Sequence, residues 1–100
     1  MKVFTGNSNP LLADSIADSL GQDIGKIEIT QFSDGELNIA FLENIRNEDV
    51  YIIQSLNSPA ENIMELLLML DAAKRASASS VVAVIPYLGY SRQDRKDEPR

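Results

Sequence analysis

The sequence predicts an α/β domain: a mostly parallel sheet flanked by helices, with a protruding antiparallel β-hairpin. Three observations carry this prediction. Short apolar runs at residues 50–53 and 81–85 have the length and composition of buried strands. Apolar residues recur at helical spacing over residues 10–20 and 59–76. Apolar and polar residues alternate on both sides of a Gly-containing turn within residues 26–42, which is typical of a hairpin.

Composition limits the class of protein. The chain has 100 residues, enough for one small domain, and its net charge of −6 argues against a nucleic-acid or anionic-membrane surface. The absence of cysteine excludes thiolate chemistry and suits a reducing cytosol, and the absence of histidine removes the usual general base. The longest apolar run is too short to span a bilayer. We therefore expect a soluble, cytoplasmic protein that binds neither nucleic acid nor membrane.

The first strand and helix have clear local signals. Residues 2–5 are expected to form a buried strand that ends at a Gly-Asn-Ser-Asn turn. Asn9 is suited to cap a helix whose first residue is Pro10, and Gly21 is suited to end it. The face expected to be buried carries Leu11, Leu12, Ile16 and Leu20.

The second helix is expected over residues 59–76. Ser58 and Glu61 have the spacing of a capping box, with Pro59 at the first helical position. The helix is apolar nearly all round, so we expect the sheet to cover one side and a partner domain or subunit to cover another. Its apolar residues are Ile63, Met64, Leu66, Leu67, Leu68, Met69 and Leu70.

Cations gather directly after the strand at residues 81–85. Arg92, Gln93, Arg95 and Lys96 follow a turn at the carboxyl end of this strand, where open α/β sheets bind their ligands. Guanidinium and ammonium groups suit a polyphosphate, and an amide can hydrogen-bond the edge of a base. The alternative is a solvated charge run at the end of the chain.

The hairpin tip at residues 32–36 reads Phe-Ser-Asp-Gly-Glu. One interpretation is an ordinary polar turn with glycine at a positive-φ position. The other is an aromatic plate for a base: Phe32 would stack on it, while Asp34 and Glu36 accept hydrogen bonds from its amino group or from ribose hydroxyls. The sequence leaves both open.

A third segment pair, Arg46 with the serine-rich residues 77–80, is either structural or a phosphate-sized anion site. The glycine-rich phosphate loops of common nucleotide folds are absent from the sequence.

Five segments taken together are similar to ribose-phosphate pyrophosphokinase (phosphoribosyl pyrophosphate synthetase). They occur in that family's order and spacing, and the similarity covers the whole chain but only the N-terminal portion of the family's enzyme. The segments are residues 32–36, 61–67, 76–78, 85–87 and 90–96.

The resemblance implies a phosphoribosyltransferase-like fold and a defined reaction. The enzyme transfers the pyrophosphoryl group of ATP to ribose 5-phosphate, with Mg²⁺, giving phosphoribosyl pyrophosphate and AMP. Its subunits assemble into dimers or hexamers, and phosphate acts as an activator. The hairpin is expected to reach into the ATP site of a neighbouring subunit.

The resemblance also implies roles for particular residues. Catalytic residues and metal ligands are expected outside residues 1–100. A regulatory phosphate site would use Arg46, Ser77 and Arg100. The implied ATP-binding residues are Phe32, Asp34, Glu36, Arg92, Gln93, Lys96 and Asp97.

Two features depart from the family pattern. Ser80 stands where many relatives carry Lys or Arg, which affects the expected phosphate site. The family's catalytic residues, its ribose 5-phosphate loop and its pyrophosphate loop are all expected beyond residue 100, so residues 1–100 would hold half of an ATP site. Because the sequence also ends within its densest functional segment, we expect residues 1–100 to be an N-terminal domain that is incomplete at its C-terminus. The alternative function is a non-catalytic regulatory relative that associates with the synthetase.

Overall fold

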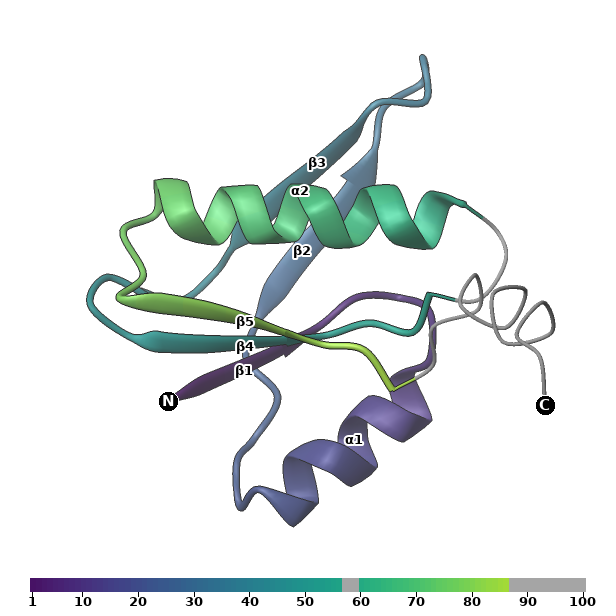
Figure 1. Ribbon diagram of the computed structural model, residues 1–100. Helices are drawn as coiled ribbons and strands as arrows, with labels where there is room; N and C mark the ends of the chain where they lie inside the picture. The colour runs from purple at the N-terminus through teal and green to yellow at the C-terminus, as the bar shows by residue number, and fades with distance from the viewer. Residues whose placement is uncertain (57–59, 87–100) are drawn as a thin grey trace, which may run out of the picture.

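A three-stranded parallel sheet lies between two helices, and a two-stranded hairpin stands apart from it (Figure 1). The computed structural model describes residues 1–56 and 60–86. The sheet has the order β1 (Lys2–Thr5), β4 (Asp49–Ile53), β5 (Ser80–Val84), and all neighbouring strands are parallel. Helices α1 (Pro10–Ser19) and α2 (Glu61–Arg75) cover opposite faces of this sheet. The predicted fold class is therefore confirmed.

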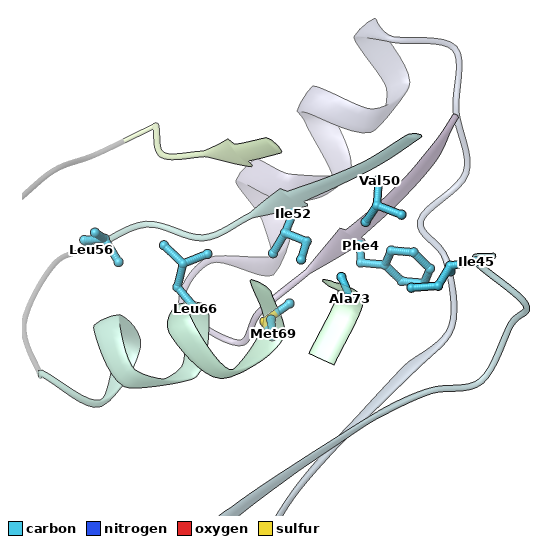
Figure 2. Close-up of a cluster of buried hydrophobic side chains, with 8 residues drawn as sticks. All are labelled: Phe4, Ile45, Val50, Ile52, Leu56, Leu66, Met69 and Ala73. Carbon is cyan, nitrogen blue, oxygen red and sulfur yellow. The ribbon is translucent and has the colours of Figure 1, made fainter. Parts of the chain in front are cut away.

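The main core lies between the sheet and α2. Phe4, Val50 and Ile52 of the strands form one buried cluster with Leu66 and Met69 of the helix, and the Phe4 ring lies beside Ile45 (Figure 2). Each of these side chains is buried, and full burial of a side chain of this size contributes about 1.5–3 kcal/mol. Because side chains alternate along a strand, the neighbouring residues face α1 and form a second, smaller cluster. That cluster contains Val3, Ala13, Ala17 and Ile53.

Helix α1 begins and ends as predicted, but its buried face differs. The Asn9 side chain accepts a hydrogen bond from the Leu12 N–H at 3.1 Å, and Gly21 follows the helix with a φ of +69°. The expected leucine face is wrong at its ends, because Leu11 is 81% exposed and Leu20 is exposed as well. Ala13 and Ala17 are buried instead, since small side chains let the helix approach the sheet closely.

Helix α2 is covered on one side only by the described residues. Its buried face includes Leu66, Met69 and Ala73, whereas Met64 and Leu67 are both 53% exposed. Ala60 precedes the helix and makes no side-chain cap, and the predicted Ser58 and Pro59 lie outside the described residues. The second cover that the sequence predicts remains a prediction.

The hairpin consists of β2 (Ile27–Gln31) and β3 (Leu37–Phe41), paired with Ile29 opposite Ile39. Its base packs on the core: the rings of Phe41 and Phe4 meet edge to face with centroids 4.8 Å apart. Glu43 adds a polar connection, because one carboxylate oxygen accepts from the Lys2 side chain at 2.9 Å and the other from the Lys26 N–H at 2.6 Å. The hairpin therefore has an anchored base.

Strand β5 is less buried than the sequence suggested. It pairs with β4 along one edge, and among the described residues no strand pairs with its other edge. Val82 on this strand and Ile85 directly after it are exposed, so the expectation of a fully buried strand is wrong here. Within residues 1–56 and 60–86, no helix is long and apolar enough to cross a membrane.

The Glu43 contacts predict a pH-dependent contribution to stability. Hydrogen bonds from Lys2 and then from the Lys26 N–H lower the pKa of Glu43, and the same Lys2–Glu43 bond raises the pKa of Lys2. The contribution should be complete between the ordinary carboxyl and amine values, about 4.3 and 10.4. It should be lost as the pH falls through the lowered pKa of Glu43, or rises through the raised pKa of Lys2.

The measurement is the difference in Tm between the wild type and Glu43→Gln across this pH range. We expect a gap at neutral pH that closes in strong acid and again at high pH. Glu28→Gln, on the exposed side of the same hairpin, is the control and should show no such pattern. A gap that stays constant into strong acid would contradict the assignment.

Candidate functional site

The hairpin tip is a three-residue loop with a defined backbone. The Gly35 N–H donates to the Phe32 carbonyl and the Phe32 N–H donates to the Glu36 carbonyl, both at 2.8 Å. Gly35 has a φ of +91°, the conformation that only glycine adopts readily. A turn closed by a left-handed glycine is a common three-residue hairpin connection. The turn interpretation from the sequence is therefore correct as a description of the backbone.

The tip also brings three predicted site residues together. The side chains of Phe32, Asp34 and Glu36 are all exposed, and the phenyl group is 52% accessible although burial would be favourable. One Asp34 oxygen accepts from the Glu36 N–H at 3.0 Å, which orients the carboxylate over the turn. In Figure 1 the tip stands clear of α2 and of the sheet. It therefore presents one aromatic ring and two carboxylates to the outside.

A groove of about 870 Å³ separates the hairpin from the first half of α2. Apolar side chains from both elements line it, including Leu37 and Met64. Carboxylates and amides line it as well, among them Glu36, Glu61 and Asn62. The groove extends from the tip toward the carboxyl end of β1, where Asn7 lies.

At that carboxyl end, a buried polar network holds two loops together. Glu65, only 7% exposed, accepts from the Asn7 N–H at 2.6 Å and from the Gln54 amide at 3.1 Å. The Gln54 carbonyl oxygen accepts from the Ser8 hydroxyl at 2.7 Å, and that hydroxyl accepts from the Ser55 N–H at 2.8 Å. Within the described residues, every buried side-chain nitrogen or oxygen has a partner. Hydrogen bonds thus connect the loops after β1 and β4 with each other and with α2.

The network requires a glycine at position 6. A Cβ there would overlap the Gln54 amide and lie 2.6 Å from the Glu65 carboxylate. Sequence reasoning missed these residues as functional candidates. Two signals were present: a glycine directly after a buried strand, and a charged residue inside the apolar run of α2.

Two predicted anion-site residues, Arg46 and Ser77, lie at the opposite end of the sheet, its amino edge, where the strands begin. The Asn47 N–H donates to the Ser77 carbonyl at 2.9 Å, which places the loop of Arg46 beside the end of α2. Asn47 and Ser77 have φ values of 63° and 69°, a conformation that non-glycine residues rarely adopt. Arg46 is exposed, with its N–H bonded to Asn44 at 3.0 Å. The structure thus brings Arg46 and Ser77 into neighbouring loops.

The remaining predicted site residues lie outside the described part of the chain. These are Arg92, Gln93, Lys96, Asp97 and Arg100. For residues 1–56 and 60–86, no group of three or more acidic, histidine or cysteine side chains is placed to hold a metal ion.

The matching family model and two similar curated proteins all concern ribose-phosphate pyrophosphokinase. Residues 1–100 match the protein family described as the N-terminal domain of ribose phosphate pyrophosphokinase. A "Ribose-phosphate pyrophosphokinase" of Bacillus subtilis is 56% identical over 101 residues, covering all of this chain and 32% of that protein. A protein of the same name from Chlorobaculum tepidum is 54% identical over 100 residues and is covered to 31%. The chain thus spans about a third of the length of these relatives.

A solved structure shares the fold. The crystal structure of phosphoribosylpyrophosphate synthetase from Mycobacterium smegmatis superposes with a TM-score of 0.84 and 36% sequence identity. The superposition covers 98% of this chain and 34% of that one.

The polar network predicts the outcome of a Gly6→Ala substitution. The added methyl group must displace the Gln54 amide or the Glu65 carboxylate from its hydrogen bonds, so we expect a loss of about 1–3 kcal/mol in the free energy of unfolding. Urea denaturation measures this loss. A methyl group at residue 6 would overlap the Gln54 amide, so the losses in unfolding free energy caused by Gly6→Ala and Gln54→Ala should be non-additive by about 0.5–3 kcal/mol. If the two losses in unfolding free energy simply add in the double variant, the predicted overlap does not determine the stability.

Proposed function

Because the chain belongs to the family of N-terminal domains of ribose phosphate pyrophosphokinase, we propose that it supplies half of an ATP site to that enzyme. The reaction is transfer of the pyrophosphoryl group of ATP to ribose 5-phosphate, giving phosphoribosyl pyrophosphate and AMP. Residues 1–100 serve as the N-terminal domain of this longer enzyme. The observation that carries the proposal is the exposed tip, where Phe32, Asp34 and Glu36 converge on one anchored hairpin.

The chemistry of the tip suits an adenine nucleoside. A phenyl ring stacks on a purine, an interaction worth about 1–3 kcal/mol per base. Carboxylates accept hydrogen bonds from an exocyclic amino group or from ribose hydroxyls. Asp34 and Glu36 lie on the same loop as the ring, and Asp34 is held by the Glu36 N–H. In this arrangement the tip orients the nucleoside while its phosphate chain points away from the two carboxylates.

The phosphate chain needs positive charge, which the tip lacks. Arg92 and Lys96 take this role in the proposal, as residues of the segment that follows β5. In the same segment Gln93 would contact the purine edge, and Asp97 is a further proposed ATP-binding residue. Mg²⁺ would neutralise charge on the ATP phosphates. We assign no described residue to this ion, since the described acidic groups form no cluster that could hold it.

The ATP site is completed by a second copy of the chain. A half-exposed phenyl group on a protruding, anchored hairpin is suited to cover a base held by another subunit. Met64 and Leu67 on the uncovered side of α2 provide apolar surface for the same association. We expect a dimer as the smallest functional unit.

A chimera tests the proposal directly. Residues 1–100 replace the matching segment of the Bacillus subtilis relative, and AMP formation from ATP and ribose 5-phosphate is measured. We expect turnover, and Phe32→Ala should raise the KM for ATP by about 5- to 150-fold, corresponding to about 1–3 kcal/mol of lost stacking. The KM for ribose 5-phosphate should stay unchanged. Leu11→Ala, which removes an exposed side chain on α1, is the matched control.

Mixing defective subunits shows whose site the hairpin serves. One chimera carries Phe32→Ala, and the other has an inactivated ribose-phosphate half but an intact hairpin. If the hairpin works in the neighbouring subunit, the mixture should be more active than the sum of the two chimeras when ATP is kept well below the raised KM of the Phe32→Ala chimera. No recovery despite proven mixing would place the hairpin over its own site. A chimera that assembles without any turnover would favour a regulatory relative instead.

For the amino edge of the sheet we propose a regulatory phosphate site that uses Arg46, Ser77 and Arg100. Two neighbouring residues hold a left-handed backbone there, and such conformations cost energy that is often tolerated at functional sites. The Ser77 hydroxyl and the Arg46 guanidinium suit a phosphate as donors.

Arg46→Ala in the chimera should therefore raise the phosphate concentration for half-activation about 10- to 100-fold, as expected for a lost charge-assisted hydrogen bond. Ser77→Gly, which keeps the preferred backbone, should weaken the response without destabilising the fold. Lys26→Ala controls for a general loss of positive charge. An unchanged phosphate response in both variants would remove this site from the proposal.

A further inference from the structure

The hairpin tip contains an Asp-Gly sequence, residues 34 and 35, whose chemistry differs from that of the other described aspartates. Among the aspartates that the structure describes, Asp34 alone precedes a glycine and lies outside helices and strands. Asp23 also lies in a loop, but the β-branched Ile24 follows it. The other described aspartates belong to regular elements, where the next N–H is held in a helix or beside a strand. They are Asp14, Asp18, Asp49 and Asp71.

We propose that Asp34–Gly35 is a site of spontaneous isomerisation to isoaspartate. The Gly35 nitrogen loses its proton and attacks the side-chain carboxyl carbon of Asp34, and one water molecule leaves as a five-membered succinimide forms. Water then adds back to the ring. Attack at the backbone carbonyl gives isoaspartate, in which the main chain runs through the former side chain. The net reaction is an isomerisation and needs no other reactant.

The structure favours succinimide formation because Asp34 and Gly35 are accessible to solvent and no bulky side chain hinders the attack. Asp34 and Gly35 are both exposed, so water and base reach them. Glycine adds no side chain that would shield its nitrogen, and a Cβ built on Gly35 would meet only the end of Gln31, at 3.9 Å. The bond between Asp34 and Gly35 therefore has little steric protection from this reaction.

Two local hydrogen bonds must open before the attack. The Gly35 N–H is bonded to the Phe32 carbonyl at 2.8 Å, and an Asp34 oxygen is bonded to the Glu36 N–H at 3.0 Å. Both bonds lie within the exposed tip, far from the core that holds the base of the hairpin. Opening such bonds costs much less than unfolding the domain. The reaction accordingly proceeds from a locally open tip.

Isomerisation would change the shape of the tip. It inserts one carbon into the main chain between residues 34 and 35, so the paired bonds between Phe32 and Glu36 can no longer close with the same geometry. The carboxylate also moves to a shorter side chain. Resting on the proposed function, one consequence is that aged protein binds ATP more weakly.

Peptide mapping of the chain tests the site. After prolonged incubation at neutral pH, trypsin releases residues 27–46, with Asp34 as their only aspartate, and residues 3–26, with three others. We expect peptide 27–46 to split into two chromatographic peaks of equal mass, with isoaspartate at residue 34 by electron-based fragmentation. Peptide 3–26 should show no second peak of equal mass, and any product of Asn7 deamidation is distinguished by its changed mass. The proposal fails if peptide 27–46 stays single in the folded chain while the same synthetic peptide isomerises.

Two variants separate the mechanism from its alternatives. Asp34→Glu would require a six-membered ring and should not split. Ile52→Val weakens the core by about 1 kcal/mol, which would raise the rate about fivefold if global unfolding were required. We expect no change, and a fivefold rise would overturn the local route. In the chimera, isomerisation that proceeds without loss of ATP affinity would count against the proposed function and leave this site intact.

Discussion

The burial of the Glu65 carboxylate organises the carboxyl edge of the sheet. A buried charge is costly unless donors surround it, and here the backbone and side chain of Asn7 and the amide of Gln54 supply them. Those donors come from the loops after β1 and β4, so the carboxylate can be satisfied only when both loops are in place. Gly6 makes the approach possible because it has no side chain. One charge thereby links two strands and α2.

The hairpin combines a firm base with an exposed tip. Ring packing between Phe4 and Phe41 and the Glu43 contacts hold its base against the sheet. Within the described part of the chain, the tip has only the hydrogen bonds of its own turn and of Gln31 to the Gly35 carbonyl. This division suits the proposed role of the hairpin in a second subunit, because the base sets the direction of the exposed tip. The same exposure leaves the Asp34–Gly35 step open to chemistry.

The carboxyl edge and the amino edge of the sheet, where its strands end and begin, have different physical characters. The carboxyl edge is a dense network with satisfied polar groups and lies beside the groove along the hairpin. The amino edge is held in part by one backbone hydrogen bond, from the Asn47 N–H to the Ser77 carbonyl, between two residues with left-handed backbone. A left-handed conformation costs about 1–2 kcal/mol per non-glycine residue, which the bond between the two loops helps to offset. Separate edges would give the proposed nucleotide site and the proposed phosphate site room to act independently.

Local signals in the chain were sufficient for the positions of its elements. The Asn9 cap, Gly21, the alternation in the hairpin and the turn at Gly35 depend on neighbours within a few residues, so they can be read directly. The grouping of Phe32, Asp34 and Glu36 follows for the same reason, because they share one turn.

Other features depend on which surfaces meet, and these needed the three-dimensional structure. Burial of Ala13 and Ala17 in place of the flanking leucines depends on how closely α1 approaches the sheet. The Glu65 network joins residues 58 positions apart, and the Asn47–Ser77 contact joins loops 30 apart. No local pattern encodes such distances, because packing decides which distant residues meet and which polar groups must therefore find one another.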